Sequence, residues 1–600
     1  MNIRLTIMPF FVLIAAFGLA GCGTGIGVEG GVANHPSESC ISCKMGINTG
    51  KWSGAAIVSE WQSSAHALKG GAGCADCHGT STNHGGASTC AGCHGGGGPK
   101  PIVDADQRGK CNGCHNETKG FGFSTVDGTT RNVAKSHFSN MSASYVSSQN
   151  LNQCRKCHNP HALDRMEYLR DWARSGHGRT GAVPWNTRDF KTMNTCNRCH
   201  TATGFVKYLQ TGDATAWGSA SDPTKEMLGC YACHTDYRYT VRMTGAVTAS
   251  YTNASESYPD AGLSNLCLNC HVGRESGNSI KNSSANFTSA SFINSHYLTA
   301  GGTIFGKTGY HFSGRGYDSH LKFDGTANDF IHDRLGREDL GTYAVQKGFS
   351  PSEIAQFTNA QSFIQAKGLS GAGPCVVCHL TSLMKERDSS HTFSPFTDYG
   401  DSLKALNPVC VNCHPSRGAG SNAKVTWFEG EWDRNFKAGL AVLKGKLSDN
   451  GIIFYNAYPY FFADANGDGT VCTPDKTALP ACNGNTEPVK QWNLPYGVDK
   501  AKDLMGTAFN YNLLYHDPGA IAHNRLYASR LLYDSIDFID DGVLNYSVGT
   551  TIKGLPSSDD RDYAAVLLIR NLVHNGQSGA AKLPDYGNWN PAVDDSNERY

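Results

Sequence analysis

The pattern C-x-x-C-H occurs nine times in this chain and constrains its fold more than any other feature. Its first cysteines are Cys74, Cys90, Cys111, Cys154, Cys196, Cys230, Cys267, Cys375 and Cys410. Its second cysteines are Cys77, Cys93, Cys114, Cys157, Cys199, Cys233, Cys270, Cys378 and Cys413. Its histidines are His78, His94, His115, His158, His200, His234, His271, His379 and His414. A shuffled chain of this composition would contain roughly 0.03 such motifs, so the repeat has a chemical cause.

The pattern is typical of the covalent attachment of c-type haem. The two thiols bind the two vinyl groups of one porphyrin, and the adjacent imidazole lies over the iron as its proximal ligand. A C-x-x-C pair alone also occurs in half of a zinc site, in a redox disulfide or in a structural disulfide. None of these needs a histidine directly after the second cysteine. The sequence therefore predicts nine haems.

The remaining histidines could supply the second axial ligand of each iron. The chain has 23 histidines, and nine are proximal. The candidates for the distal position are His66, His84, His137, His161, His177, His296, His332, His391 and His523. For each of them the alternative is an ordinary surface, hydrogen-bonded or helix-capping histidine, and His516 is a further possible ligand. Two axial imidazoles leave the iron no open position, which suits electron transfer.

The spacing of the motifs predicts an unusual fold. From Cys74 to His414 there are 341 residues for nine haems, which is too little chain for separate helical pockets. We expect a mainly irregular, haem-wrapped chain with short α-helices over 40–414. Residues 415–600 form a more helical C-terminal region, because apolar side chains recur at the helical period. The expected helices there cover 432–447, 504–513, 521–536 and 563–573.

The N-terminus has the features of an exported lipoprotein. An uncharged apolar run from Leu5 to Leu19 follows Arg4 and is too short to span a bilayer, which is typical of a signal peptide over 1–21. Leu19, Ala20, Gly21 and Cys22 resemble the lipobox of bacterial lipoproteins, which implies lipid on the Cys22 thiol. The alternative is a plain secretory signal. Residues 22–39 then comprise the lipidated cysteine and a flexible Gly-rich tether. The protein would be anchored to a membrane without crossing it.

One motif departs from the pattern. Cys40 and Cys43 have the haem spacing, but Lys44 stands where histidine is expected. It resembles the C-x-x-C-K motif of the pentahaem nitrite reductase family, whose lysine-ligated haem has an open sixth position. Either Cys40 and Cys43 hold a tenth haem, or they form a disulfide.

A loop in the C-terminal region has the spacing of a calcium site. Asp464, Asn466, Asp468, Thr470 and Asp475 occupy positions 1, 3, 5, 7 and 12, with Gly469 at position 6. The alternative is a solvated acidic turn. Cys472 and Cys482 are the remaining pair, and in an exported protein we expect a disulfide between them.

The mature chain resembles the multihaem c-type cytochrome lipoproteins on the outer surface of metal-respiring bacteria. The resemblance rests on the nine motifs and the lipobox, and Lys44 departs from it. It implies an electron carrier, rather than an enzyme, that passes electrons from the cell envelope to metal oxides or other extracellular acceptors. The implied partners are other cytochromes or a porin–cytochrome conduit. The implied location is the outer membrane at the cell surface, with the periplasmic face as the alternative.

Two other functions stay open on the same residues. One is reduction of a small oxyanion, such as nitrite, at a Lys44-ligated haem. The other is a filament built from subunits that stack haem to haem. A nucleic-acid partner is not expected, because 52 basic and 52 acidic residues balance and no basic stripe is present.

Overall fold

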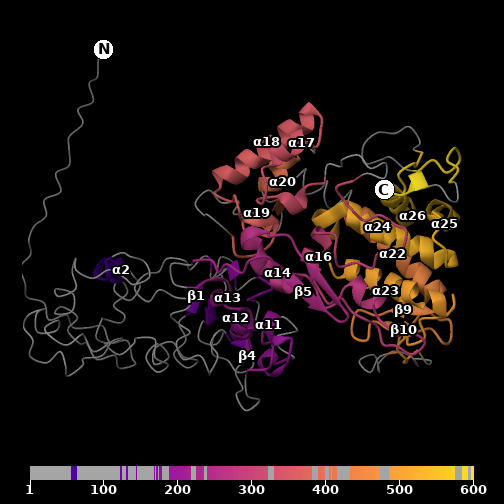
Figure 1. Cartoon of the computed structure of the whole chain (residues 1–600), viewed down its shortest axis with the longest axis horizontal. Helices are drawn as coiled ribbons and strands as arrows, with labels where there is room; N and C mark the ends of the chain where they lie inside the picture. Colours follow the sequence, from indigo (N-terminus) through magenta and orange to yellow (C-terminus); the bar gives the residue numbers. More distant parts are fainter. Residues whose placement is uncertain are drawn as a thin grey trace, which may run out of the picture. The chain divides into compact units, whose positions relative to one another are not determined.

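The computed structural model describes most of the chain beyond position 188 and short segments before it. The described ranges are 56–63, 122–124, 130–132, 143–144, 168, 171–172, 175–178, 188–217, 225–235, 240–321, 330–381, 390–398, 404–406, 408–414, 433–472, 485–573, 584–591 and 596–600. The chain divides into two compact units, one of 1–121 with 150–164 and one of 122–149 with 165–600. In the first unit the described residues form α2 (Ile57–Ser63). All other described elements belong to the second unit (Figure 1).

Short helices dominate the middle of the second unit. Four of them contain a C-x-x-C pair: α13 (Cys230–Cys233), α14 (Asn265–His271), α19 (Gly373–His379) and α20 (Pro408–Cys413). A fifth, α11 (Asn197–His200), begins directly after the first cysteine of its pair, Cys196, which is its N-cap residue. A separation of three residues is close to one helical turn, so both thiols of a motif lie on the same helix face. The histidine follows at the helix end. Each described motif therefore presents its three haem-binding side chains from one compact turn of chain.

Further helices in this part of the chain connect the motif helices. They are η2 (Phe190–Thr192), α12 (Ala202–Thr211), η3 (Gly262–Ser264), α15 (Gly277–Lys281), α16 (Ala300–Ile304), η4 (His332–Arg334), α17 (Leu340–Gln346) and α18 (Pro351–Ala366). The longest, α18, begins at a capping box, in which Ser350 and Glu353 satisfy each other's backbone N–H groups, and Pro351 occupies the first turn.

The described strands form five two-stranded sheets. Four are antiparallel: β1 (Gly122–Ser124) with β2 (Thr130–Asn132), β5 (Thr248–Tyr251) with β6 (Ala254–Ser257), β7 (Phe396–Asp398) with β8 (Lys404–Leu406), and β9 (Ile452–Phe454) with β10 (Phe461–Ala463). The fifth pairs β3 (Ala143–Ser144) with β4 (Lys225–Glu226) in parallel. Such small sheets order the chain only locally, and helices provide most of the packing in the second unit.

Longer helices follow the last motif. They are α22 (Arg434–Asp449), η7 (Val498–Lys500), α23 (Ala501–Tyr515), α24 (Ala520–Asp541), α25 (Val548–Gly554), α26 (Asp559–Leu568) and η9 (Ser596–Glu598). The structure has helices at all four positions expected from the apolar period, with ends that differ by a few residues. Figure 1 shows α22, α23 and α24 side by side in orange, and they contact one another.

The main apolar core joins residues from both sides of position 414. Phe287, Tyr310 and Phe312 are buried in one cluster with Leu443 of α22 and Phe509 of α23. Burying a side chain of this size contributes about 1.5–3 kcal/mol.

Hydrogen bonds reinforce the same junction. The backbone N–H of Tyr310 donates to Asn510 Oδ1 at 2.7 Å, and Asn510 Nδ2 donates back to the Tyr310 carbonyl at 3.0 Å. The C-terminal helices therefore share a core with the chain that precedes the last C-x-x-C-H motif.

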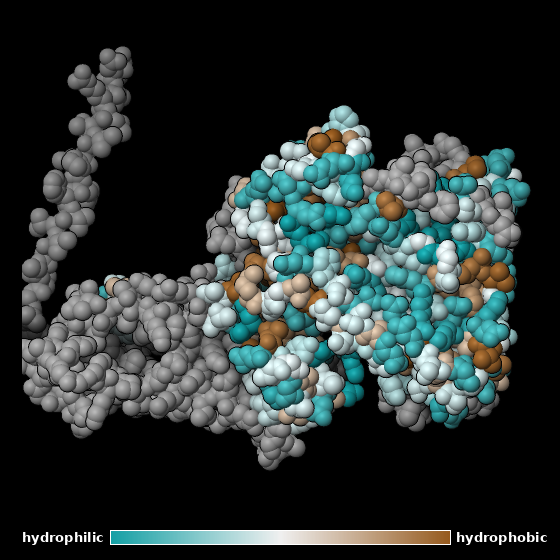
Figure 2. Space-filling view, viewed as in Figure 1, coloured by the Kyte–Doolittle hydropathy of each residue, from teal (hydrophilic) through white to brown (hydrophobic). Residues whose placement is uncertain are grey.

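The surface visible in Figure 2 is mostly hydrophilic over the described residues, with small separate brown patches. Large apolar side chains that are exposed, such as Tyr458 and Met243, lie far apart in the sequence. Among the described helices, none combines the length and the apolar character needed to cross a bilayer.

Candidate functional site

Each of the five described proximal histidines faces a different histidine from another part of the chain. The ring centres are 6.1 Å apart for His271 and His177, for His200 and His296, and for His234 and His391. They are 6.2 Å apart for His414 and His332, and for His379 and His523. The five distal partners are all the distal candidates that the described ranges contain. The assignment is one to one, and no candidate is left over among them.

This spacing fits an iron held between two imidazoles. A metal–nitrogen bond of about 2.0 Å on each side, and about 1.1 Å from each nitrogen to its ring centre, place two opposed rings about 6.2 Å apart. Histidine rings in direct contact would lie closer, as the 4.2 Å between His200 and Phe190 shows. Each pair therefore leaves the width of one coordinated metal ion between its rings, so the residues present fit the group that the motifs imply.

Hydrogen bonds orient four of these rings. Nδ1 of His271, His379 and His332 donates to the carbonyls of Leu298, Phe393 and Ala522 at 2.9, 2.9 and 2.6 Å. A carbonyl oxygen can only accept, so Nδ1 carries the proton and the lone pair remains on Nε2. In the fourth ring, His523, Nδ1 contacts the Asp517 carboxylate. A hydrogen bond of this kind on the far nitrogen is typical of metal-binding histidines.

The distal histidines come from turns and helix ends. His177 lies in a turn over 175–178, where its N–H donates to Ser175 Oγ. His296 adopts a φ of +79°, and its N–H donates to Asn294 Oδ1 at 3.0 Å. His332 begins η4, His391 precedes β7, and His523 lies in the first turn of α24. At these positions a single histidine side chain can point toward a motif in another segment of the chain.

Burial keeps several of these rings neutral. Removal from water, together with a smaller effect of nearby His271, lowers the pKa of His177 to about 4. Burial likewise lowers the pKa of His200, His296 and His379 to about 4. A neutral imidazole has the lone pair that a metal ligand needs.

The kink at the start of α24 frees a hydrogen-bond acceptor for one of these rings. Asn524 has a non-helical φ of −159° and ψ of 88°, and its Nδ2 donates to the Ile304 carbonyl and to Ser319 Oγ. The interruption of the helix leaves the Ala522 carbonyl available to His332. The same turn thus carries His523 and orients the distal candidate of a second site.

Two motif helices pack together through glycine. Gly262 and Gly373 have φ values of +57° and +76°, and a Cβ on them would lie 1.8 Å from the Gly371 carbonyl and 2.0 Å from the Ala261 carbonyl. Ser264 Oγ adds hydrogen bonds to Ala372 and Val376 across this contact. The close approach brings the motif of α14 next to the motif of α19.

Thiols of different motifs are adjacent as a result. Cys267 of α14 lies close enough to Cys375 of α19, and Cys270 of α14 close enough to Cys199 of α11, for each neighbour to raise the pKa of the α14 thiol. The attachment points of three sites therefore meet around α14.

The three described histidines outside the five pairs, His311, His320 and His516, have other partners. In His516, Nδ1 lies 3.0 Å from the Asn512 carbonyl and Nε2 lies 2.8 Å from Asn456 Oδ1. Both ring nitrogens are engaged, and the geometry gives His516 no role as a ligand.

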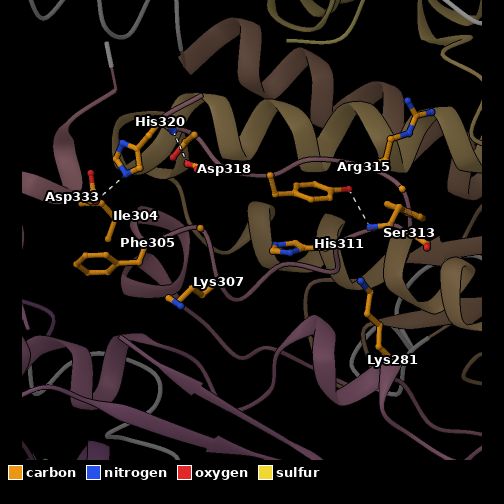
Figure 3. Close-up of a pocket in the computed structure, with 15 residues that line it drawn as sticks. Lys281, Ile304, Phe305, Lys307, His311, Ser313, Arg315, Asp318, His320 and Asp333 are labelled. Atoms are coloured by element: carbon orange, nitrogen blue, oxygen red, sulfur yellow. Dashed lines mark hydrogen bonds and ion pairs between the residues drawn. The ribbon is translucent and has the colours of Figure 1, made fainter. Parts of the chain in front are cut away.

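A cavity of about 560 Å³ lies beside the paired sites and is lined by residues from 281, 304–320 and 333. Figure 3 shows His320 near Asp318 and Asp333 on one side of it, and Lys281 beyond His311 on the other. His320 contacts the Phe330 carbonyl through Nδ1 and Asp333 through Nε2, and His311 Nε2 lies 2.8 Å from the Tyr527 hydroxyl. None of the ten paired histidines lines this cavity.

The predicted calcium loop closes around one point. Oxygens of Asp464, Asn466, Asp468 and the Thr470 carbonyl lie 2.9, 2.8, 3.1 and 3.0 Å from a single atom, Nδ2 of the buried Asn485. Gly467 and Gly469 supply the positive φ values that the turn needs, +73° and +67°. The oxygens at positions 1, 3, 5 and 7 thus converge, and the Asn485 amide nitrogen takes the central place.

Several predicted site residues lie outside the described residues. They are Cys22, Cys40, Cys43, Lys44, Asp475, Cys482, the four motifs that begin at Cys74, Cys90, Cys111 and Cys154, and the distal candidates His66, His84, His137 and His161. The sequence analysis also missed Asp517, Phe393 and Ala522, which hold the far nitrogens of paired rings. Asp517 carried a local signal, since it stands between two histidines in the H-D-P-G-A-I-A-H stretch that begins at His516.

Comparison with known proteins gives two related matches. The chain is 35% identical over 416 residues to the C-type polyheme cytochrome OmcB of Geobacter sulfurreducens, a match that covers 64% of this chain and 49% of that protein. It is 35% identical over 402 residues to the C-type polyheme cytochrome OmcC of the same species, covering 62% and 46%. The chain thus spans about half the length of the curated relatives it matches. No family model and no solved structure matches the chain.

Proposed function

We propose that this chain, which is a multihaem c-type cytochrome in the region that it shares with these relatives, transfers electrons through a series of bis-histidine haems. The observation that carries the proposal is the one-to-one set of histidine pairs at 6.1–6.2 Å. A bound haem supplies a one-electron ferric/ferrous couple. With both axial positions held by protein, the iron keeps no site for a substrate, which favours electron transfer over bond chemistry.

The chain's own residues hold the iron ligands in place during this transfer. Carbonyl groups and one carboxylate fix the ring orientation, as at His271, His379, His332 and His523. The paired rings are partly buried. The ligands of a bound iron would not need to move when its charge changes. The reorganisation energy of electron transfer would therefore be small.

The order of the sites in space supports a continuous path. Cys199 lies near Cys270, and Cys267 lies near Cys375, so the motif at Cys267 adjoins the motifs at Cys196 and Cys375. His177, the partner of His271, is close enough to His200 and His379 for their charges to lower its pKa. The site built on α14 is therefore central, and an electron would reach it from either side.

The number of haems, the membrane anchor and the electron-transfer partners are proposed from the sequence. We propose nine haems, with a tenth if Cys40 and Cys43 also bind one, and lipid on Cys22 that anchors the protein to the outer membrane at the cell surface. Other cytochromes or a porin–cytochrome conduit would supply electrons, and extracellular acceptors such as metal oxides would receive them. The names of the two relatives, polyheme cytochromes, support the haem assignment.

We also propose a calcium ion in the loop that begins at Asp464. The convergence of four oxygens on one point supports it. A bound ion would take the place of the Asn485 amide nitrogen, and Asp475 would add a third carboxylate to those of Asp464 and Asp468. Calcium would then hold β10 and the following chain together.

The direct test is the haem content and spin state of the mature protein from a c-type cytochrome host. The intact mass should show nine or ten haems, and electron paramagnetic resonance of the oxidised protein should show low-spin ferric iron at the bis-histidine sites. A largely high-spin protein that binds carbon monoxide at most of its haems would contradict the electron-transfer proposal. A single high-spin haem that Lys44→His converts to low spin would instead favour the reductase alternative.

A further inference from the structure

The carboxylate of Asp517 distinguishes one of the five histidine pairs from two others. Asp517 Oδ1 lies 2.8 Å and Oδ2 lies 3.0 Å from Nδ1 of His523, and the Asp517 side chain is 1% exposed. His523 faces the proximal histidine His379. In two other pairs, Nδ1 of His271 and of His332 donates to a backbone carbonyl, as Nδ1 of His379 does within the same pair.

The fold holds this carboxylate firmly. Asp517 lies in the turn between α23 and α24, where its N–H donates to the Leu514 carbonyl and its own carbonyl accepts from the N–H of Ala520. The turn therefore directs the Asp517 side chain toward the first turn of α24, which carries His523. Because Asp517 is buried and His523 is mostly buried, water weakens the interaction between the carboxylate and the imidazole N–H only slightly.

We propose that Asp517 is a positioning residue that lowers the reduction potential of the haem attached at Cys375 and Cys378. A charged acceptor on Nδ1 draws the proton away from the imidazole and makes Nε2 a stronger donor to the iron. A stronger donor and a nearby negative charge both stabilise ferric iron more than ferrous iron. A carbonyl partner does this less, so the Asp517 site should hold an electron less tightly than it would with a neutral partner.

The consequence concerns the path of the electrons. The motif at Cys375 adjoins the central motif at Cys267, because Gly262 and Gly373 allow the segments 261–262 and 371–373 to approach closely. A lower reduction potential would make the ferrous state of this haem less stable. An electron that reaches the haem would therefore pass more readily to a neighbouring haem. Asp517 would thus set a step in the series of potentials, a role that the attachment motif alone does not encode. This inference rests on the proposed bis-histidine haem between His379 and His523.

The test is a redox titration of the complete haem-loaded protein, followed by optical and electron paramagnetic resonance spectra. In Asp517→Asn the amide oxygen can still accept from Nδ1, but the charge is gone. We expect an unchanged haem count, unchanged low-spin signals, and one haem whose reduction equilibrium shifts at least tenfold toward the ferrous form, which is about 59 mV for one electron. Asp517→Glu should keep the wild-type curve, and Asp499→Asn, which removes an exposed carboxylate on η7, should leave all haems unshifted.

Two results would overturn the proposal. The first is an Asp517→Asn titration that superimposes on that of the wild type with all haems present. The second is loss of a low-spin signal in Asp517→Asn that Asp517→Glu restores without any change of potential, because the carboxylate would then only hold the ring. Failure of the underlying haem assignment is distinguishable, since the wild type itself would lack low-spin iron at the His379–His523 site.

Discussion

The carbonyl oxygen of Phe393 accepts a hydrogen bond from Nδ1 of His379 at 2.9 Å. The same residue contacts two distal candidates through its ring, whose centre lies 4.6 Å from that of His177 and 5.9 Å from that of His391. Its φ of +55° turns the backbone so that the ring and the carbonyl serve different sites. One residue thus touches axial histidines of three proposed haems, those of the motifs at Cys230, Cys267 and Cys375.

Phe393→Ala should loosen two sites at once and leave the third in place. The substitution keeps the carbonyl that holds His379 but removes the ring that packs on His177 and His391, at a cost of about 1–2 kcal/mol in the free energy of unfolding. We expect altered g values for two low-spin haems and a lower melting temperature. Phe349→Ala, which removes an aromatic ring from the contact with Phe357 and Tyr343, is the control and should leave the g values unchanged. Identical spectra for Phe393→Ala and the wild type would contradict the shared role.

Replacement of a single distal histidine should open a single iron. In His391→Ala or His296→Ala we expect one haem to become high-spin when oxidised and to bind one equivalent of carbon monoxide when reduced, because alanine supplies no ligand. His320→Ala and His516→Ala are matched controls, since their ring nitrogens have other partners. A carbon monoxide adduct in a control, or none in the variants, would show that the axial pairs differ from those proposed.

Calcium should stabilise the C-terminal part of the chain. At a calcium concentration about 100 times the dissociation constant, binding should raise the free energy of unfolding by about 2.7 kcal/mol, and a chelator should reverse this. Asp464→Ala should abolish the effect, because Asp464 supplies the first ligand. Its carboxylate also accepts hydrogen bonds from the N–H groups of Gly467 and Gly469 in the turn. Asp449→Asn, an exposed carboxylate near the end of α22, should retain it. Equal melting temperatures with calcium and with chelator would exclude the site.

A buried cluster of charges should govern part of the pH dependence of stability. Burial raises the pKa of Asp537 to about 6, although Ser547 and Arg315 donate hydrogen bonds to it. Because the folded protein then holds a proton that the unfolded chain releases near pH 3.8, this group makes the free energy of unfolding fall as the pH rises from about 3.8 to 6.

Asp537→Asn should remove that contribution. The difference in the free energy of unfolding between wild type and variant, measured in urea from pH 4 to 7, should change by on the order of 3 kcal/mol and level off above pH 6. A difference that is constant over this range would show that Asp537 titrates normally in the folded state.

The attachment motifs could be predicted from the sequence because their chemistry is local. Two thiols and an imidazole within five residues suffice to identify a haem site, whatever the rest of the chain does. The helices near 432–447 and 521–536 were predictable for a similar reason, since the helical spacing of apolar residues is visible within one continuous segment. The calcium spacing is also local, but the buried Asn485 at its centre lies beyond the loop and gave no signal.

The choice of partners was decided by the tertiary structure alone. His332 and the Ala522 carbonyl that orients it are 190 positions apart. The sequence alone offered His296, His391 and His523 as candidates and His516 as a further possible ligand. In the structure the His516 ring is engaged by Asn512 and Asn456, whereas the His523 ring faces His379. A histidine becomes a distal ligand when the fold brings its segment next to a motif that is distant in the sequence. Close glycine contacts, turns and a kinked helix determine which segments lie next to each other. The sequence therefore determined which groups could bind haem, and the packing of distant segments decided which histidine meets which.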